Sequence, residues 1–320
     1  MLQLLFAIAL SLCTASAMAV DWDDYPDDLP QFDFSGDALK AQWATLTAMT
    51  HVEYPDEAWL KKMLETHPRL AHAMLVLATE KNPPPAVYMA IHDSNYAPLA
   101  AELQTVWRLH YSGRYKEAYE LGMSLGPFGE IPAVYSLLVH TTLLEHDADD
   151  KMRDFQQAEA QANVGLTLAP DYTFALFGRV YSRVRMLELM STGEARSSGL
   201  ISQAKDTLTE LAEAHPNEAA YPLTRGGLQA GIVERVGSFL GSLTYGATES
   251  NALEDFQKAI ALSPDLPMVY NEFVIGLTRL DAKDHRKDIR NLLQHCLTLT
   301  PFSAEEALNQ QQCRNRLKEL

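Results

Sequence analysis

Four segments of the chain share one spacing of apolar residues, and this spacing constrains the fold more than any other feature. Each segment begins with a small or apolar residue, repeats such residues four, seven and ten positions later, and has a proline twelve positions after its start. The segments cover residues 158–170, 204–216, 252–264 and 289–301. Steps of three and four residues place side chains on one helix face, and proline ends the helix because it has no N–H to donate. The pattern predicts a protein built from repeated helices.

The rest of the sequence also has helical periodicity, and it lacks the sustained alternation of β-branched and polar residues that indicates strands. Residues 38–96 repeat apolar positions at helical spacing but outside the shared register, so we expect an N-terminal helical cap there. Residues 303–320 begin with Ser303, followed three positions later by Glu306. This capping-box pattern predicts a C-terminal capping helix. The sequence therefore predicts an all-α protein.

Two short motifs accompany the shared register. Residues 113–118 have the spacing Gly-x-Tyr-x-x-Ala, and residues 177–181 read Phe-Gly-x-x-Tyr. Together with the register, these motifs resemble the tetratricopeptide repeat (TPR) family, whose repeats use small, large and alanine positions at this spacing and end in a proline. Residues 252–264 are close to the family consensus, and the resemblance covers residues 97–302. It implies an α-solenoid of about four to five helical hairpins, in which the first helix of each hairpin lines a concave surface.

The spacing between repeats is longer than in that family. The terminal prolines lie 46, 48 and 37 residues apart, whereas a TPR unit has about 34 residues. The excess falls between the helices of a hairpin, so we expect irregular insertions at residues 191–199 and 231–250. The second insert is apolar and glycine-rich, which fits a lid or ligand pocket, a membrane-touching tip, a subunit contact, or a helix extension packed on its own hairpin. Its candidate pocket residues are Phe239, Leu240, Leu243 and Tyr245.

The start of the chain predicts export. Residues 2–14 are almost entirely apolar and carry no charge, and Ala17 and Ala19 form an A-x-A cleavage signal. This combination is typical of a secretory signal peptide, so we expect residues 1–19 to be removed and the mature protein to be periplasmic or secreted. The alternative is a lipoprotein acylated at Cys13, which would place the protein on a membrane.

An acidic segment follows the predicted signal peptide. Residues 20–37 contain seven aspartates and two prolines, and we expect them to be extended or disordered because like charges repel and proline interrupts hydrogen bonding. The aromatic residues of this segment either anchor a partner or pack on the protein's own helices. The whole chain has a formal net charge of -16, which argues against nucleic acid or an anionic lipid surface as a partner.

Motifs for catalysis and cofactor binding are missing from the sequence, which has no G-x-S-x-G, no phosphate-binding glycine loop and no H-E-x-x-H. Residues 140–150 collect His, Glu and Asp but match no metal-ligand spacing, so a polar turn is expected there. Cys296 and Cys313 fall in consecutive predicted helices, where they form either a disulfide or two buried free thiols. We therefore predict a protein that is not an enzyme and uses no cofactor and no metal.

Four polar residues are candidates for binding a partner. Arg179 and Arg183 are four residues apart and share a helix face, and arginine pairs well with carboxylates, so they predict a carboxylate receptor. Asn271 falls where some TPR domains place an asparagine that grips a peptide carboxylate, and Arg279 follows on the same predicted helix. The alternative is that these arginines pair with the protein's own acidic residues.

These features predict an exported, non-catalytic scaffold or adaptor whose concave groove binds a peptide or another protein. The alternative is a small-molecule receptor or transporter-associated component with a pocket near residues 231–250. In size, export signal and irregular hairpins, the chain resembles periplasmic TPR proteins that partner the solute-binding proteins of TRAP transporters. An enclosed apolar pocket would favour the receptor, an open groove lined by the arginines would favour the adaptor, and a buried titratable cluster would favour an enzyme.

Overall fold

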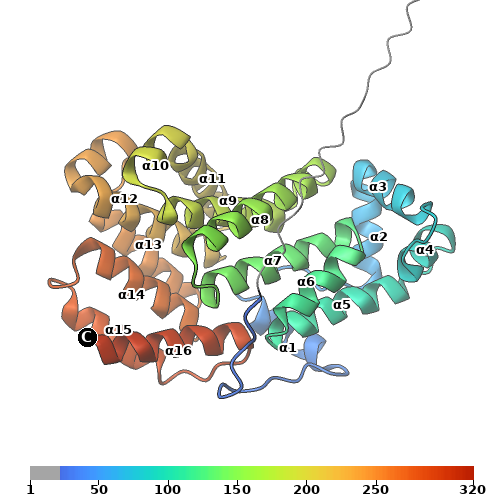
Figure 1. Cartoon of the computed structure of the whole chain (residues 1–320), viewed down its shortest axis with the longest axis horizontal. Coiled ribbons are helices and arrows are strands. Elements are labelled where there is room, and N and C mark those ends of the chain that lie inside the picture. The colour runs from blue at the N-terminus through green and yellow to red at the C-terminus, as the bar shows by residue number, and fades with distance from the viewer. Residues whose placement is uncertain (1–21) are drawn as a thin grey trace, which may run out of the picture.

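The structure is a computed structural model that describes residues 22–320, and most of that range is helical (Figure 1). That range contains sixteen helices and no strand, which confirms the predicted all-α class. The predicted signal peptide, residues 1–19, and the alternative acylation site Cys13 lie outside the described residues. None of the helices in residues 22–320 combines the length and apolarity needed to cross a membrane. The helices are α1 (Ala38–Leu46), α2 (Glu57–Thr66), α3 (Pro68–Ala78), α4 (Pro85–His92), α5 (Ala97–Tyr111), α6 (Tyr115–Ser124), α7 (Pro127–Leu143), α8 (Ala148–Leu168), α9 (Thr173–Leu189), α10 (Thr192–Ser198), α11 (Leu200–Ala214), α12 (Ala220–Tyr245), α13 (Glu249–Leu262), α14 (Pro267–Asp281), α15 (Arg286–Cys296) and α16 (Ala304–Glu319).

The repeated prolines mark the ends of helices. α8, α11 and α13 each end two residues before the proline of their segment, and α15 ends five residues before Pro301. Side-chain hydrogen bonds cap the N-termini of two of the later helices. Ser303 accepts a hydrogen bond from Glu306 N at the start of α16, and Thr248 accepts one from Asn251 N at the start of α13. Local sequence therefore fixes where these helices begin and end.

Six helices form a closed inner ring. α5, α7, α9, α12, α14 and α16 each contact the next, and α16 also contacts α5 and α7, which closes the ring (Figure 1). α6, α8, α11, α13 and α15 each pack against the two inner helices that flank them in the sequence. Burying the apolar stripe of each helix against its neighbours stabilises such a stack, and the inner faces of the six ring helices surround the middle of the molecule.

The C-terminal helix is central to this closure. The first six residues of α16, residues 304–309, are buried, and two of them are glutamates. A disulfide between Cys296 and Cys313 ties α16 to α15, with the two Cα atoms 6.5 Å apart. α16 therefore covers the last hairpin and at the same time returns the chain to the helices where the ring begins.

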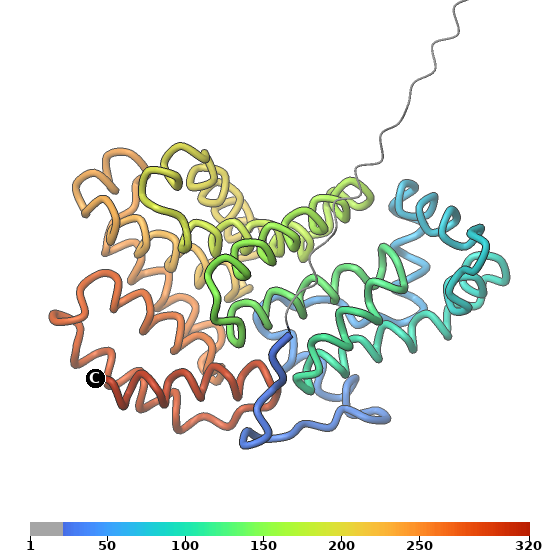
Figure 2. Tube along the Cα trace, viewed as in Figure 1, coloured from blue at the N-terminus to red at the C-terminus, as the bar shows by residue number. Residues whose placement is uncertain are grey.

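The acidic N-terminal segment is extended and packs on the protein's own helices (Figure 2). Leu29 and Phe34 are buried, and the Trp22 ring lies 5.4 Å from the Tyr119 ring, measured between centroids. Arg108 on α5 donates from Nε to the backbone oxygen of Phe34 at 3.0 Å. The aromatic side chains of this segment are thus anchored inside the molecule, while most of its aspartates face solvent.

Candidate ligand pocket inside the helical ring

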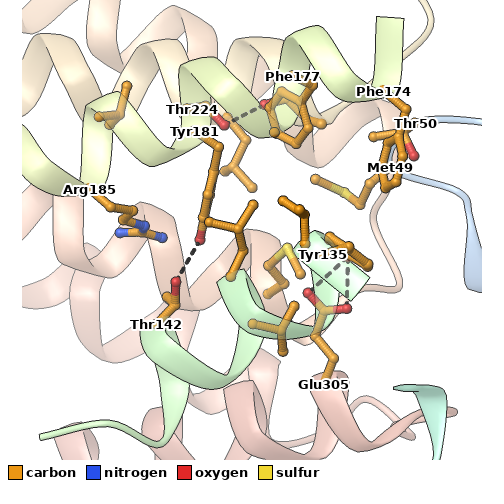
Figure 3. Close-up of a pocket in the computed structure, with 18 of the residues that line it drawn as sticks. Met49, Thr50, Tyr135, Thr142, Phe174, Phe177, Tyr181, Arg185, Thr224 and Glu305 are labelled. Atoms are coloured by element: carbon orange, nitrogen blue, oxygen red, sulfur yellow. Dashed lines mark hydrogen bonds between the residues drawn. The ribbon is translucent and has the colours of Figure 1, made fainter. Parts of the chain in front are cut away.

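A partly enclosed pocket lies inside the ring of helices (Figure 3). It spans about 1030 Å³, including the part that is open to solvent. α7, α9, α12, α14 and α16 supply most of its walls, and the loop after α1 supplies Met49 and Thr50. Its lining is mostly apolar, a composition typical of small-molecule sites. The apolar residues that line it include Val134, Leu138, Phe174, Phe177, Leu223 and Met268.

Small residues on the inner helices keep this space open. Gly178 on α9 and Gly227 on α12 both line the pocket. A Cβ added at Gly178 would lie 3.9 Å from Leu138 Cδ1, and one added at Gly227 would meet no atom within 4 Å. A larger side chain at either position would extend into the pocket, so the glycines are part of what makes it.

One side of the pocket carries a buried carboxylate. Tyr135 on α7 donates its hydroxyl to Glu305 on α16, with Oη 2.9 Å from Oε2, and this pair is seen at the lower right of Figure 3. The Glu305 side chain is only 8% exposed. His110 on α5 lies behind it, with Nε2 3.9 Å from Glu305 Oε2, and burial lowers the pKa of His110. The imidazole is therefore neutral near pH 7 and leaves the carboxylate charge uncompensated.

The opposite side holds a balanced group of charges. Arg185 on α9 pairs with Glu188 at 3.1 Å and with Glu272 at 2.5 Å, and Arg279 on α14 pairs with Glu188 at 2.9 Å. Burial alone would raise the pKa of Glu188, but the two guanidinium groups outweigh it and lower that pKa to about 2. The Arg185 guanidinium also lies 4.8 Å from the centre of the Tyr181 ring. Two cations thus face two anions, and the half-exposed Glu234 also lies 3.9 Å from Arg279 Nε.

The four predicted partner-binding residues lie on two helices, Arg179 and Arg183 on α9 and Asn271 and Arg279 on α14. Arg183 pairs with Glu159 on α8 at 2.6 Å, and Arg179 lies beside it, with its pKa lowered by burial and by the charge of Arg183. Asn271 is fully buried, where its amide nitrogen donates to Asn309 on α16 at 3.0 Å. Arg279 belongs to the balanced charge group. Three of these four side chains are therefore occupied by partners within the protein.

The insert at residues 231–250 extends α12 past a kink. Gly237 has a φ of 77° and a ψ of 160°, and these non-helical angles turn the chain. Glycine suits this position because residues with a side chain rarely adopt such a conformation. Beyond the kink, the candidate pocket residues Phe239, Leu240 and Leu243 are 78%, 50% and 74% exposed. Tyr245 instead lines a second, smaller hollow between α9, α10, α11 and α12. The structure thus separates the four candidates, three on the surface and one beside a hollow.

The polar run at residues 140–150 forms the end of α7, a turn and the start of α8. Asp147 caps α8 by accepting from Asp149 N and Asp150 N, and Glu145 accepts from His146 N at 2.6 Å. Within residues 22–320, no group of three or more His, Cys, Asp or Glu side chains is placed to hold a metal ion.

Sequence reasoning missed the residues that give the pocket its polar character, Tyr135, Tyr181, Arg185 and Glu305. Tyr135 and Tyr181 sit on apolar helices, where an aromatic residue indicates core packing. Glu305 stands in the first turn of a predicted helix, where an acidic residue is explained by the helix dipole. The available signal was an acidic pair beside an otherwise apolar start, residues 304–308.

Comparison with known protein families and with curated proteins finds no match to this chain. What the protein does must therefore be inferred from its own fold and pocket.

Proposed function

We propose that this protein is an exported, non-catalytic, TPR-like receptor that binds a small and mostly apolar molecule in the pocket inside its helical ring. The observation that carries this proposal is the closure of the ring by α16. In an open solenoid, the inner helices line a groove that a peptide can enter along its length. Here the same inner faces surround a pocket with apolar walls, which suits a compact ligand.

The adaptor function has less support from the site. A groove that reads peptide carboxylates needs accessible cations, yet Arg183 and Arg279 pair with Glu159 and Glu188, and Asn271 is fully buried. A peptide would have to replace these internal partners, and breaking a partly buried ion pair is costly.

Two features support a place outside the cytosol. The disulfide between Cys296 and Cys313 fits an oxidising compartment, as does the export signal predicted for residues 1–19. The resemblance to periplasmic TPR proteins that partner TRAP-transporter solute-binding proteins supports a transporter component as protein partner. In that setting, the pocket would hold the molecule to be passed on.

The proposal is tested by filling the pocket. We expect the neutral apolar dye N-phenyl-1-naphthylamine to bind the mature chain with increased fluorescence, and Gly227→Leu to weaken that binding at least about tenfold, a loss of about 1.4 kcal/mol. Replacing glycine by leucine within a helix raises helix propensity, so a lower affinity would not reflect a weaker fold. Melting temperatures of both proteins check this directly.

Gly193→Leu is the matched control, because Gly193 also lies in a helix with no atom within 4 Å of an added Cβ, but on the surface at α10. We expect this variant to bind the dye like the wild type. Equal weakening by both substitutions, or no dye binding by the wild type, would overturn the proposal.

A further inference from the structure

The charges that line the pocket do not cancel at every point. Arg185 and Arg279 are matched by Glu188 and Glu272 on one side. Glu305, on the other side, has no such partner: among residues 22–320, the only candidate cation within 4.0 Å of its carboxylate is His110. At 3.9 Å the two side chains are too far apart for a hydrogen bond.

Burial of His110 disfavours a positive charge on its ring. The single hydroxyl proton of Ser136 is donated to the backbone oxygen of Pro132 at 2.9 Å, so Ser136 accepts from His110 Nδ1 at 3.0 Å. Because burial lowers the pKa of His110, the ring is neutral and its Nε2 carries a lone pair. A neutral His110 therefore leaves the Glu305 carboxylate without a full counter-charge.

Aromatic rings surround this carboxylate. Another, smaller hollow shares Tyr135, Phe174 and Glu305 with the main pocket and is also lined by Trp107 and Tyr111. The Tyr135 ring lies 5.4 Å from Phe174 and 5.9 Å from Trp107, measured between centroids. In the described part of the chain, no lysine or arginine lines this hollow. Aromatic faces and an uncompensated carboxylate are the two groups that recognise an organic cation.

We propose that the Glu305 side of the pocket binds the ammonium group of an apolar amine, with Glu305 as counter-ion and the rings of Tyr135 and Phe174 beside it. This inference rests on the proposed receptor function and narrows its ligand class. The apolar wall holds the body of the amine, and the carboxylate and the rings select its charged end. An anionic ligand is disfavoured here, because its charge would face Glu305 across a poorly solvated pocket.

The raised pKa of Glu306, the residue next to Glu305, is consistent with an uncompensated negative charge on Glu305. Burial and the negative charge of Glu305 raise the pKa of Glu306 to about 8. A ligand cation at Glu305 would offset the negative charge that Glu306 faces and so lower the pKa of Glu306.

The test compares three probes with the same eight-carbon chain: n-octylammonium, octan-1-ol and octanoate. Each probe displaces N-phenyl-1-naphthylamine from the mature protein at about 0.15 M salt, where long-range attraction to a chain of net charge -16 is largely screened. We expect n-octylammonium to bind at least about tenfold more tightly than octan-1-ol, and octanoate to bind most weakly.

Glu305→Gln removes the charge and keeps the shape of the side chain. We expect this variant to bind n-octylammonium and octan-1-ol equally, with its affinity for octan-1-ol unchanged. Glu80→Gln, which removes an exposed carboxylate on the turn after α3, should keep the wild-type ranking.

The outcomes separate the two proposals. Dye and octan-1-ol binding without a preference for n-octylammonium would overturn the cation site and leave the receptor function standing. Failure of the dye and of all three probes to bind would overturn both. The wild-type ranking is decisive by itself, so a folding defect in Glu305→Gln would not leave the inference untested.

Discussion

Glu188 and Glu306 are both glutamates with little exposure to solvent, and their neighbours give them opposite acidities. Burial raises the pKa of either carboxyl. At Glu188 two guanidinium groups overcome this effect and lower the pKa to about 2. Glu306 lies beside Glu305 instead, and its pKa rises to about 8. One glutamate therefore favours the folded state when it is ionised, and the other when it is protonated.

We expect Glu306 to make the free energy of unfolding fall as the pH rises from about 4.5 to about 8. In this window the folded protein keeps a proton that the unfolded chain has released, so a higher pH favours unfolding. Glu306→Gln should remove that decrease, which amounts to roughly a few kcal/mol over this pH range. Urea unfolding at a series of pH values measures it, with Glu80→Gln as control.

Glu188 should act in the opposite direction at lower pH. Its stabilising contribution is complete above its ordinary pKa of 4.5 and is lost as the pH falls towards about 2. Glu306→Gln and Glu80→Gln should both keep this loss of stability in acid, because Glu188 is unchanged in them. If wild type and Glu306→Gln had parallel pH profiles between 4.5 and 8, the raised pKa of Glu306 would be wrong.

At this scale the sequence indicated residue types better than partners. The arginines stand out in an acidic chain, and the sequence also allows them to pair with the protein's own acids. The partners named by the structure, Glu159 for Arg183 and Glu188 for Arg279, lie 24 and 91 residues away. Glu305 faces the pocket because of how α16 is rotated against α7, and tertiary packing sets that rotation. A single sequence does not encode it as a local pattern.

At the scale of elements, the disulfide links the last two helices of the chain. Cys296 and Cys313 are 17 residues apart, and closing a loop of this length removes conformational freedom from the unfolded chain. We expect the double variant Cys296→Ala/Cys313→Ala to lose about 3 kcal/mol of unfolding free energy. Equilibrium denaturation with and without a reducing agent measures this loss. The double variant should be insensitive to the reductant, and a wild type equally insensitive would contradict the bond.

The ends of helices were the most predictable elements. Prolines at fixed positions located the ends of α8, α11 and α13, because proline blocks a helix through local chemistry alone. The prediction of irregular inserts was wrong, because α10 occupies residues 192–198 and α12 continues to Tyr245. The glycines of the second insert, residues 231–250, made only a break in the helix predictable, and Gly237 supplies it. The direction of the chain after this break was not predictable, because the kink at Gly237 sends Phe239 and Leu243 into solvent through backbone angles that no side-chain pattern reports.

At the scale of the whole molecule, ring closure was beyond the reach of the sequence. A repeat fixes how neighbouring units pack, but the rise and rotation of each step decide whether the stack stays open. The steps of this chain differ, with prolines 46, 48 and 37 residues apart, so the accumulated rotation cannot be read from one unit. The sixth inner helix meets the first two and adds Glu305 and Asn309 to the wall of the pocket. Site and overall shape were therefore missed together.

Deleting residues 303–320 should open the ring and remove the site while the other helices stay folded. The remaining inner helices keep the outer helices that pack on both sides of them, so circular dichroism should show a loss of helix close to that of α16 alone. With the ring open, the radius of gyration from small-angle X-ray scattering should increase, and N-phenyl-1-naphthylamine should no longer bind.

The Cys296→Ala/Cys313→Ala variant is the control, because it lacks the cross-link but keeps α16 and should still bind the dye. If the shortened chain bound the dye as the intact chain does, closure by α16 would not be what forms the site. The pocket would then have to lie within the walls supplied by α7, α9 and α12.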